Sequence, residues 1–93
     1  KVAVAGATGL VGEALLDALA NSTLPVGSVV ALASDRSLGR EVGYGDDSLP
    51  VSDLATHDFA GVDLALFAAG TEAAHAHVPR ALDAGCTVVD LST

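Results

Sequence analysis

The first twelve residues, KVAVAGATGLVG, constrain the fold of this chain most strongly. Residues 2–5 form a short apolar run, which is typical of a strand buried on both faces. Gly6, Gly9 and Gly12 then repeat every third position, and a helical pattern begins at about Leu10. This order favours phosphate binding, because glycine lets the backbone approach a ligand and a helix N-terminus offers unpaired N–H groups. A tight strand–helix turn without a ligand is the alternative interpretation.

Composition narrows the class of protein further. The chain has 93 residues, of which 51% are hydrophobic, and it predicts one small globular domain or part of a larger protein. A net charge of −8 argues against nucleic acid as a partner, and no apolar run is long enough to predict a membrane partner. A single cysteine excludes an internal disulfide and fits a reducing compartment. Because methionine is absent and both ends lie beside apolar runs, we expect the N-terminal part of a longer protein.

The first half of the chain predicts a helix between two buried strands. Apolar spacing predicts a helix over about residues 10–20, with a buried face made by Val11, Ala14, Leu15, Ala18 and Leu19. A second apolar run predicts a parallel strand over about residues 28–33. Weak alternation over residues 38–53 predicts a small hairpin that turns at residues 45–47, and Pro50 predicts that its arm lies at an edge.

The second half repeats the strand–helix–strand order. We expect a helical turn at residues 57–61, a third core strand at 63–69, a helix at about 71–84 and a last strand at 87–91. Pro79 predicts a kink or two abutting segments in that helix, and Gly85 fits the left-handed position after its end. Its predicted buried stripe consists of Ala74, Val78, Ala81 and Leu82. The fold class predicted is therefore α/β, a doubly wound, Rossmann-like parallel sheet with a small hairpin after its second strand.

The tip of the second strand carries the residues that would choose between nicotinamide cofactors. In a dinucleotide fold an acidic side chain here binds the free ribose 2′-hydroxyl of NAD, whereas arginine accommodates the 2′-phosphate of NADP. Ser34, Asp35, Arg36 and Ser37 follow the strand in this chain. A guanidinium between hydroxyl groups suits a phosphate, so we favour NADP over NAD, with a solvated polar loop as the other alternative.

The tip of the third core strand is the next place a dinucleotide would pass. Ala68, Ala69, Gly70 and Thr71 follow that strand. Crevices open at the carboxyl ends of parallel strands, so this loop should face the same cleft as the glycine turn. Its small residues leave room for a cofactor, while Thr71 could act as a helix N-cap or as a donor to a ligand.

The remaining polar residues predict no chemistry of their own. His75 and His77 are two positions apart on a helix, so their side chains diverge, and we expect exposed histidines and no metal site. Cys86 precedes a buried strand and has no histidine near it in sequence, so a small buried residue is the better interpretation. No catalytic residue can be assigned within the chain.

Four stretches together resemble aspartate-semialdehyde dehydrogenases in content, order and spacing: VAVAGATGLVGEALL, LASDRSLGREV, DFAGVDLALFAAG and AGCTVVDLST. The resemblance covers nearly the whole chain. It implies that residues 1–93 are the NADP-binding domain of a two-domain cytoplasmic enzyme, which forms a homodimer through a second domain absent from this chain. It implies reductive dephosphorylation of L-aspartyl-4-phosphate in lysine, threonine and methionine biosynthesis, through a cysteine thioester and a histidine base that both lie outside the chain.

The same resemblance assigns cofactor contacts by position. The pyrophosphate would be held by the glycine turn, with Gly6 and Gly12, and by Thr8, Gly9, Leu10 and Val11. The 2′-phosphate would be held by Arg36 and Ser37 with Ser34, and Ala69 and Gly70 would lie near the nicotinamide.

Three alternatives remain open at this point. Many family members carry Asp-Asn-Ser-Ser where this chain has Asp90, Leu91, Ser92 and Thr93. The lost amide favours a non-catalytic dinucleotide-binding paralogue as one alternative. An N-acetyl-gamma-glutamyl-phosphate reductase-like enzyme of arginine synthesis is another, because it shares the thioester logic. An extended short-chain reductase also uses Gly-Ala-Thr-Gly, but the residues after the second strand do not favour it.

Overall fold

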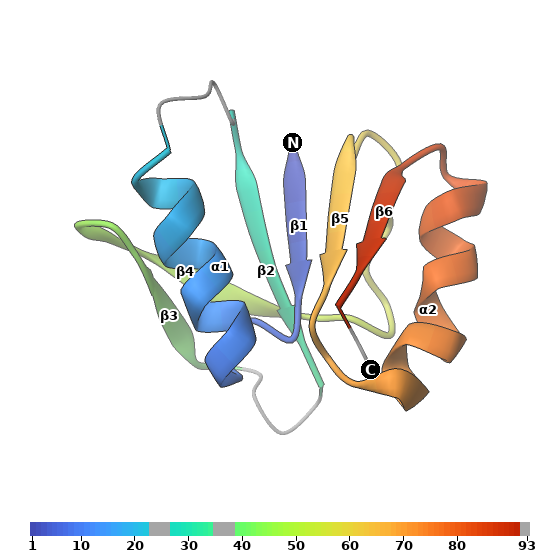
Figure 1. The fold of residues 1–93 in the computed structure, drawn as a ribbon, viewed down its shortest axis with the longest axis horizontal. Helices are drawn as coiled ribbons and strands as arrows, with labels where there is room; N and C mark the ends of the chain where they lie inside the picture. Colours follow the sequence, from blue (N-terminus) through green and yellow to red (C-terminus); the bar gives the residue numbers. More distant parts are fainter. Residues whose placement is uncertain (23–26, 35–38, 92–93) are drawn as a thin grey trace.

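The computed structural model describes residues 1–22, 27–34 and 39–91 (Figure 1). Within these residues the strands form one six-stranded sheet in the order β3-β4-β2-β1-β5-β6. The β3–β4 pair is antiparallel, and every other neighbouring pair is parallel. The elements are β1 Val2–Ala5, α1 Leu10–Ala20, β2 Val29–Ala33, β3 Glu41–Tyr44, β4 Asp47–Asp53, β5 Leu64–Phe67, α2 Thr71–Asp83 and β6 Thr87–Asp90.

Alternation along the central strands builds a separate core on each face of the sheet. Val2 and Val4 of β1 join a buried cluster with Leu16 of α1, whereas Ala3 and Ala5 join a second cluster with Ala81 of α2. Successive side chains of a strand point to opposite faces, so a strand that is apolar at every position must be covered on both. The predicted doubly wound Rossmann-like sheet is confirmed.

Chain order places a switch point beside β1. The chain leaves β1 through α1 to reach β2 on one side, and it later enters β5 on the other side of β1. The carboxyl ends of these parallel strands meet at one edge of the sheet, the lower edge in Figure 1. In open α/β sheets this edge, at the switch point, is where a crevice forms.

Helix α1 has the predicted bounds but a different buried face. Leu16 is fully buried and Gly12 is buried, whereas Val11 is 53% exposed and Ala14 and Ala18 are exposed. The predicted buried face was therefore wrong for Val11, Ala14 and Ala18. Its other two members, Leu15 and Leu19, are half-buried. The reason is the close approach of Gly12 to the β1–α1 turn, which rotates the Gly12 and Leu16 side of α1 toward the sheet.

The predicted hairpin is present, but Pro50 does not lie in an edge strand. Strand β4 sits between β2 and β3, and β3 forms the edge. Pairing of β4 with β2 starts at Val51, one residue after the proline, so the missing N–H of Pro50 removes no bond from that ladder. The hairpin packs Val42, Tyr44 and Leu49 against the α1 face of the sheet.

The connection from β4 to β5 is not helical. Hydrogen-bonded turns occur at residues 54–56 and 60–61, so the helical turn expected at residues 57–61 is absent from this described segment. The segment contributes the buried side chains of Leu54, Phe59 and Val62 to the core on the α2 face of the sheet. Strand β5 is shorter than expected because Asp63 lies before its first residue, and the chain turns away after Phe67.

Helix α2 is a single helix that includes Pro79, so of the two outcomes predicted for this proline, a kink or two abutting segments, the second does not occur. Its N-cap is Gly70 and not Thr71. Of the predicted stripe, Ala74 and Ala81 are buried and Val78 is half-buried, but Leu82 is 56% exposed.

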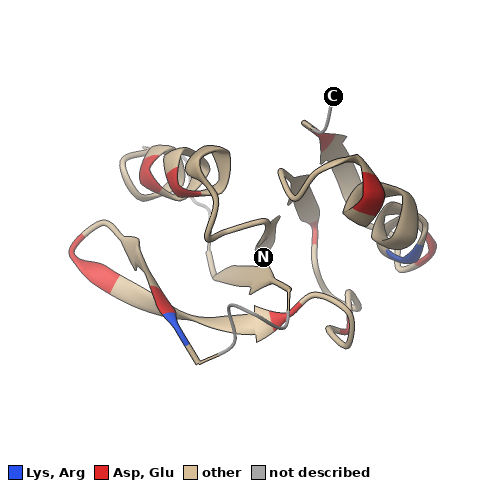
Figure 2. Ribbon diagram, turned by 90° about the horizontal axis from the view of Figure 1, so that it is seen from below, with Lys and Arg blue, Asp and Glu red and all other residues tan. Residues whose placement is uncertain are grey.

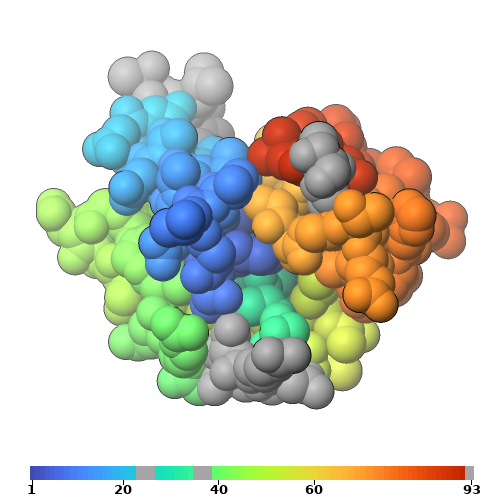
Figure 3. All heavy atoms as spheres, turned by 60° about the horizontal axis from the view of Figure 1, so that its bottom comes forward, coloured from blue at the N-terminus to red at the C-terminus, as the bar shows by residue number. Residues whose placement is uncertain are grey.

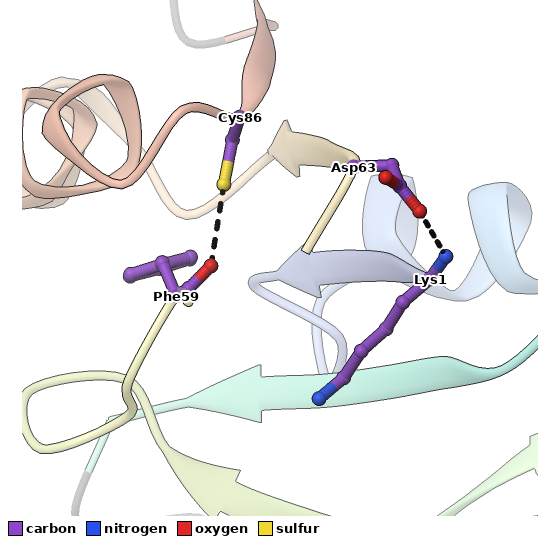
Figure 4. A network of polar contacts seen from close by, with 4 residues as sticks. All are labelled: Lys1, Phe59, Asp63 and Cys86. Carbon is purple, nitrogen blue, oxygen red and sulfur yellow. Dashed lines mark hydrogen bonds and ion pairs between the residues drawn. The ribbon is translucent and has the colours of Figure 1, made fainter. Parts of the chain in front are cut away.

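The end of α2 confirms the left-handed glycine. Gly85 has φ +90°, and its N–H donates to the Leu82 carbonyl while the Cys86 N–H donates to the Ala81 carbonyl. These are the two bonds of a Schellman motif. The motif delivers Cys86 into the core, 6% exposed, where its thiol donates to the Phe59 carbonyl at 3.6 Å (Figure 4). Figure 4 also shows the contact between the α-amino group of Lys1 and the Asp63 carboxylate, and the two atoms are 2.7 Å apart.

Candidate functional site

A cavity of about 270 Å³ lies at the carboxyl edge of the sheet, at the switch point. It is formed by the turn after β1, by the residues that directly follow β2, β4 and β5, and by the first turn of α2. Figure 3 looks toward this edge and shows the starts of α1 and α2 on either side of a hollow. The residues that line the cavity are Gly6, Thr8, Gly9, Ser34, Leu54, Ala68, Ala69 and Ala73.

Gly6 fixes the turn after β1. Its φ of +89° is disfavoured for any residue with a side chain, and a Cβ built there would lie 2.6 Å from the carbonyl oxygen of Ala68. The N–H groups of Gly6 and Ala7 both donate to the Leu32 carbonyl, at 2.8 and 3.1 Å. The turn is therefore held between β2 on one side and the loop after β5 on the other, which makes Gly6 a structural requirement of the fold.

Gly12 and Gly9 have different surroundings. A Cβ at Gly12 would lie 2.0 Å from the Gly6 carbonyl oxygen, so Gly12 lets the first turn of α1 rest on the β1–α1 turn. A Cβ at Gly9 would meet only that same oxygen, at 3.5 Å, which is ordinary contact. Protein packing therefore does not require glycine at position 9. Gly9 lines the cavity, and the absence of a side chain there lets a ligand come close to its backbone.

Both helices begin at the cavity, each with a glycine N-cap that makes no side-chain capping hydrogen bond: Gly9 for α1 and Gly70 for α2. The first N–H groups of an α-helix lack intrahelical partners and carry partial positive charge. Within the described residues no charged side chain lines the cavity, and Figure 2 shows Asp and Glu spread over the elements around it. In the described residues, the groups at the cavity that could bind an anion are thus the backbone N–H groups at these two helix starts.

The profile of the family described as "Semialdehyde dehydrogenase, NAD binding domain" matches residues 1–93 of the chain. The chain belongs to this family. The family model therefore supports a nicotinamide dinucleotide as the cofactor of this domain.

Individual relatives agree with this assignment. An aspartate-semialdehyde dehydrogenase of Legionella pneumophila is 49% identical over 90 residues, which are 97% of this chain and 26% of that protein. A USG-1 protein homolog of Pseudomonas aeruginosa is 48% identical over 99% of this chain and 27% of its own length. The solved structure of a probable aspartate-semialdehyde dehydrogenase from Pseudomonas aeruginosa superposes with a TM-score of 0.93 at 48% identity, covering 98% of this chain and 27% of that one. The semialdehyde dehydrogenase domain described here thus spans about a quarter of the length of these relatives.

The structure brings together five of the residues predicted for the cofactor site. Gly6, Thr8, Gly9, Ser34 and Ala69 all line the cavity. The other described ones lie next to it: Gly70 caps α2, and Gly12 packs against the turn. Leu10 and Val11 are in the first turn of α1 with side chains 87% and 53% exposed, and neither belongs to the lining of the cavity. Asp35, Arg36 and Ser37 lie outside the described residues.

Two lining residues of the semialdehyde dehydrogenase domain were not predicted, Leu54 and Ala73. Ala68 belongs to the loop that was singled out. Leu54 follows β4, and the rule that crevices form at the carboxyl ends of parallel strands would have found it. That signal was missed because β4 was interpreted as an edge arm of a hairpin, although it pairs in parallel with β2.

A polar cluster around Arg80 also went unpredicted. The Arg80 guanidinium donates to the carbonyls of Leu54 and His57 and to Nδ1 of His77, and it lies 5.4 Å from the centroid of the Phe59 ring. His77 is half-buried, so the expectation of an exposed helical histidine was wrong for it and right for His75. Arginine has no acceptor, so Nδ1 of His77 must be the unprotonated nitrogen.

The two histidines of this cluster have lowered pKa values. Burial lowers the pKa of His57, with further lowering by Lys1 and Arg80 against the opposing effect of Asp58. Burial and then Arg80 lower the pKa of His77 against the opposing effect of Asp53. Both rings are therefore neutral at neutral pH.

Three further observations concern the described residues. Nowhere in residues 1–22, 27–34 and 39–91 do three or more His, Cys, Asp or Glu side chains gather in a way that could hold a metal ion. None of the helices in this part of the domain is long and apolar enough to cross a membrane. Burial, with a smaller effect of Asp63, raises the pKa of the Cys86 thiol, which suits a packed residue and not a nucleophile.

Proposed function

We propose that the protein carrying this domain is an NADP-dependent aspartate-semialdehyde dehydrogenase and that residues 1–93 bind its cofactor. The single observation that carries the proposal is the cavity at the switch point, bordered by Gly9 and by two helix starts without side-chain caps. Relatives named as aspartate-semialdehyde dehydrogenases, at 49% and 42% identity over nearly the whole chain, support the choice of reaction.

The lining residues fit a dinucleotide in chemistry as well as in place. The backbone at Gly9 and the first N–H groups of α1, from Leu10 onward, would hold the pyrophosphate. Ser34, at the end of β2, would approach the adenosine ribose together with Arg36 and Ser37, whose charge and hydroxyl suit a 2′-phosphate. Ala69 and Gly70 would face the nicotinamide side. The cofactor supplies hydride when bound, and the role of this domain is to bind and orient it.

The reaction we infer consumes L-aspartyl-4-phosphate, NADPH and a proton and yields aspartate semialdehyde, inorganic phosphate and NADP. The nucleophilic cysteine and the histidine base would belong to parts of the protein outside this chain, as would the surface of a homodimer. In this assignment Cys86 takes no part in the reaction, since its thiol is buried against Phe59.

A non-catalytic dinucleotide-binding paralogue is the second candidate, and two observations favour it. Leu91 stands where many aspartate-semialdehyde dehydrogenases have asparagine, and its side chain is 42% exposed after β6. A relative named as a USG-1 protein homolog is 48% identical, about as similar as the relative named as a dehydrogenase.

Binding and turnover measured on one preparation separate the two candidates. The full-length protein should quench or shift NADPH fluorescence on binding, and it should reduce NADP in the presence of aspartate semialdehyde and phosphate. Tight NADPH binding without phosphate-dependent turnover would leave the paralogue as the answer. Absence of NADPH binding by folded protein would refute both candidates. A Leu91→Asn variant that gains turnover would show that this position accounts for the difference.

A further inference from the structure

The non-helical crossover from β4 to β5, residues 54–63, needs partners from elsewhere for its backbone. A crossover helix would bond its own carbonyls, but this segment makes only isolated turns. Its side chains Leu54, Phe59 and Val62 are buried in the core on the α2 face, so its carbonyls run close to apolar surroundings. Buried carbonyls without partners are costly, and a donor that reaches several of them will fix the path of the segment.

Arg80 supplies those donors from α2. Its guanidinium donates to the Leu54 carbonyl at 3.0 Å and to the His57 carbonyl at 2.6 Å. A third contact, at 2.7 Å, reaches Nδ1 of His77 one turn earlier on the same helix, and this contact orients the guanidinium. The face of the Phe59 ring packs against the guanidinium from the segment itself. One side chain thus ties two points of the crossover to α2.

The contact to Leu54 connects Arg80 with the cavity. Leu54 lines the cavity, and its N–H donates to the Ala33 carbonyl at 2.9 Å, at the end of β2. Ala73, which forms the facing part of the lining, is seven positions before Arg80 on α2 and therefore lies on the same side of that helix. The Arg80 contacts thereby set how far the Leu54 side of the cavity stands from the α2 side.

We propose that Arg80 is a positioning residue of the dinucleotide site, which holds the Leu54 wall of the cavity in place without touching the cofactor. The inference rests on the proposed function, because it takes the cavity to be the dinucleotide site. It predicts that loosening this contact weakens cofactor binding and leaves the chemical step unchanged.

His77 makes the contacts of Arg80 sensitive to pH. The neutral ring accepts from Arg80, whereas a protonated ring has no acceptor at Nδ1 and repels the guanidinium. The charged and titratable groups around the pair are Asp53, which favours protonation of His77, and, around the adjoining His57, Lys1 and Asp58. Because Arg80 opposes protonation, the contact should be intact at neutral pH and weaken in acid.

Steady-state kinetics of the full-length protein test the proposal. Arg80→Met keeps the aliphatic stem and removes all three donations, so the KM for NADPH should rise by about threefold to tenfold with kcat unchanged. The KM for NADH should rise by the same factor, because Arg80 does not contact the 2′-phosphate in this proposal. Arg80→Lys, which can reach a single carbonyl, should give an intermediate KM. Asp83→Met is the matched control, since it places the same side chain at an exposed position of α2.

A second variant keeps the proposal testable if Arg80→Met does not fold. Gln at position 77 can accept a hydrogen bond and does not titrate, so His77→Gln should match wild type at pH 7.5 and lose part of the rise in KM between pH 7.5 and 5.5. Equal KM values for wild type and Arg80→Met, or an unchanged acid rise in His77→Gln, would overturn the proposal while leaving the proposed function intact. Failure of wild type to bind NADPH would instead overturn the proposed function.

Discussion

Gly12→Ala should unfold the protein more easily, although alanine is the better helix former. The new Cβ would lie 2.0 Å from the Gly6 carbonyl oxygen, 2.7 Å from its carbon and 2.9 Å from the Cα of Ala7. These are backbone atoms, held by the bonds of Gly6 and Ala7 to the Leu32 carbonyl, so they cannot rotate away. Helix α1 would have to move outward by about 1 Å, and overpacking of this kind costs about 1–3 kcal/mol or more.

The helix propensity works in the opposite direction and is smaller. Replacing an interior helical glycine by alanine gains about 1 kcal/mol. Because the overlap at Gly12 involves three backbone atoms, we place its cost at or above the upper end of the overpacking range, which leaves a net loss of about 2 kcal/mol in the free energy of unfolding. Urea denaturation of the full-length protein, followed by circular dichroism, measures this loss.

Gly9→Ser is the matched control in the same turn. Serine is a favourable N-cap, so this variant should be as stable as wild type or more stable by a few tenths of a kcal/mol. Because Gly9 lines the cavity, the added side chain should hinder the approach of a pyrophosphate and weaken NADPH binding by about tenfold, or 1.4 kcal/mol. A Gly12→Ala variant as stable as wild type would refute the packing role of Gly12. A Gly9→Ser variant that binds NADPH normally would refute the role of Gly9 in cofactor binding.

Three further predictions concern other parts of the domain. Arg36→Ala should weaken the binding of NADPH by about 1.5–3 kcal/mol, the value of a hydrogen bond to a charged group, and the binding of NADH much less. Equal losses of affinity in a fluorescence titration would show that Arg36 does not bind the 2′-phosphate. Burial, followed by Lys1 for His57 and by Arg80 for His77, holds the pKa values of these two histidines below 6.5. The unfolded chain therefore binds more protons in acid, and the free energy of unfolding should fall as pH drops below about 6.5. Chemical denaturation at pH 7.5 and 5.5 measures that fall, and a smaller fall in His77→Gln would assign part of it. The Cys86 thiol, buried and with a raised pKa, should resist iodoacetamide in the native protein and react in urea, as peptide mass spectrometry would show.

Local sequence was sufficient for the elements and for the edge of the sheet at which the site lies. The apolar run of β1, the helix start at Leu10 and the left-handed Gly85 are each decided by neighbours within a few residues, and the structure has all three where they were expected. Parallel strands then bring their carboxyl ends to one edge without further information. This is why Gly9, Ser34 and Ala69 could be predicted to share a cavity.

Features that depend on contacts between distant residues could not be predicted in this way. The buried face of α1 is turned by the contact of Gly12 with Gly6, whereas periodicity alone placed Val11 on the buried face and left Leu16 off it. The place of β4 inside the sheet depends on its pairing with β2, which no local pattern records. The Arg80 contacts to Leu54 and His57 span 26 and 23 positions, so nothing near Arg80 in the sequence announces them.

The surroundings of the glycines change what their spacing means. Gly6 and Gly12 are required by backbone contacts within the fold, so they would be expected in a ligand-free strand–helix turn as well. Gly9 is the member of the pattern that protein packing leaves unexplained, and it borders the cavity as the N-cap of α1, where it makes no side-chain capping bond. The triple-glycine spacing therefore supports phosphate binding through Gly9 and the first N–H groups of α1, which lack intrahelical partners. The other two glycines support the architecture that brings these groups to the switch point.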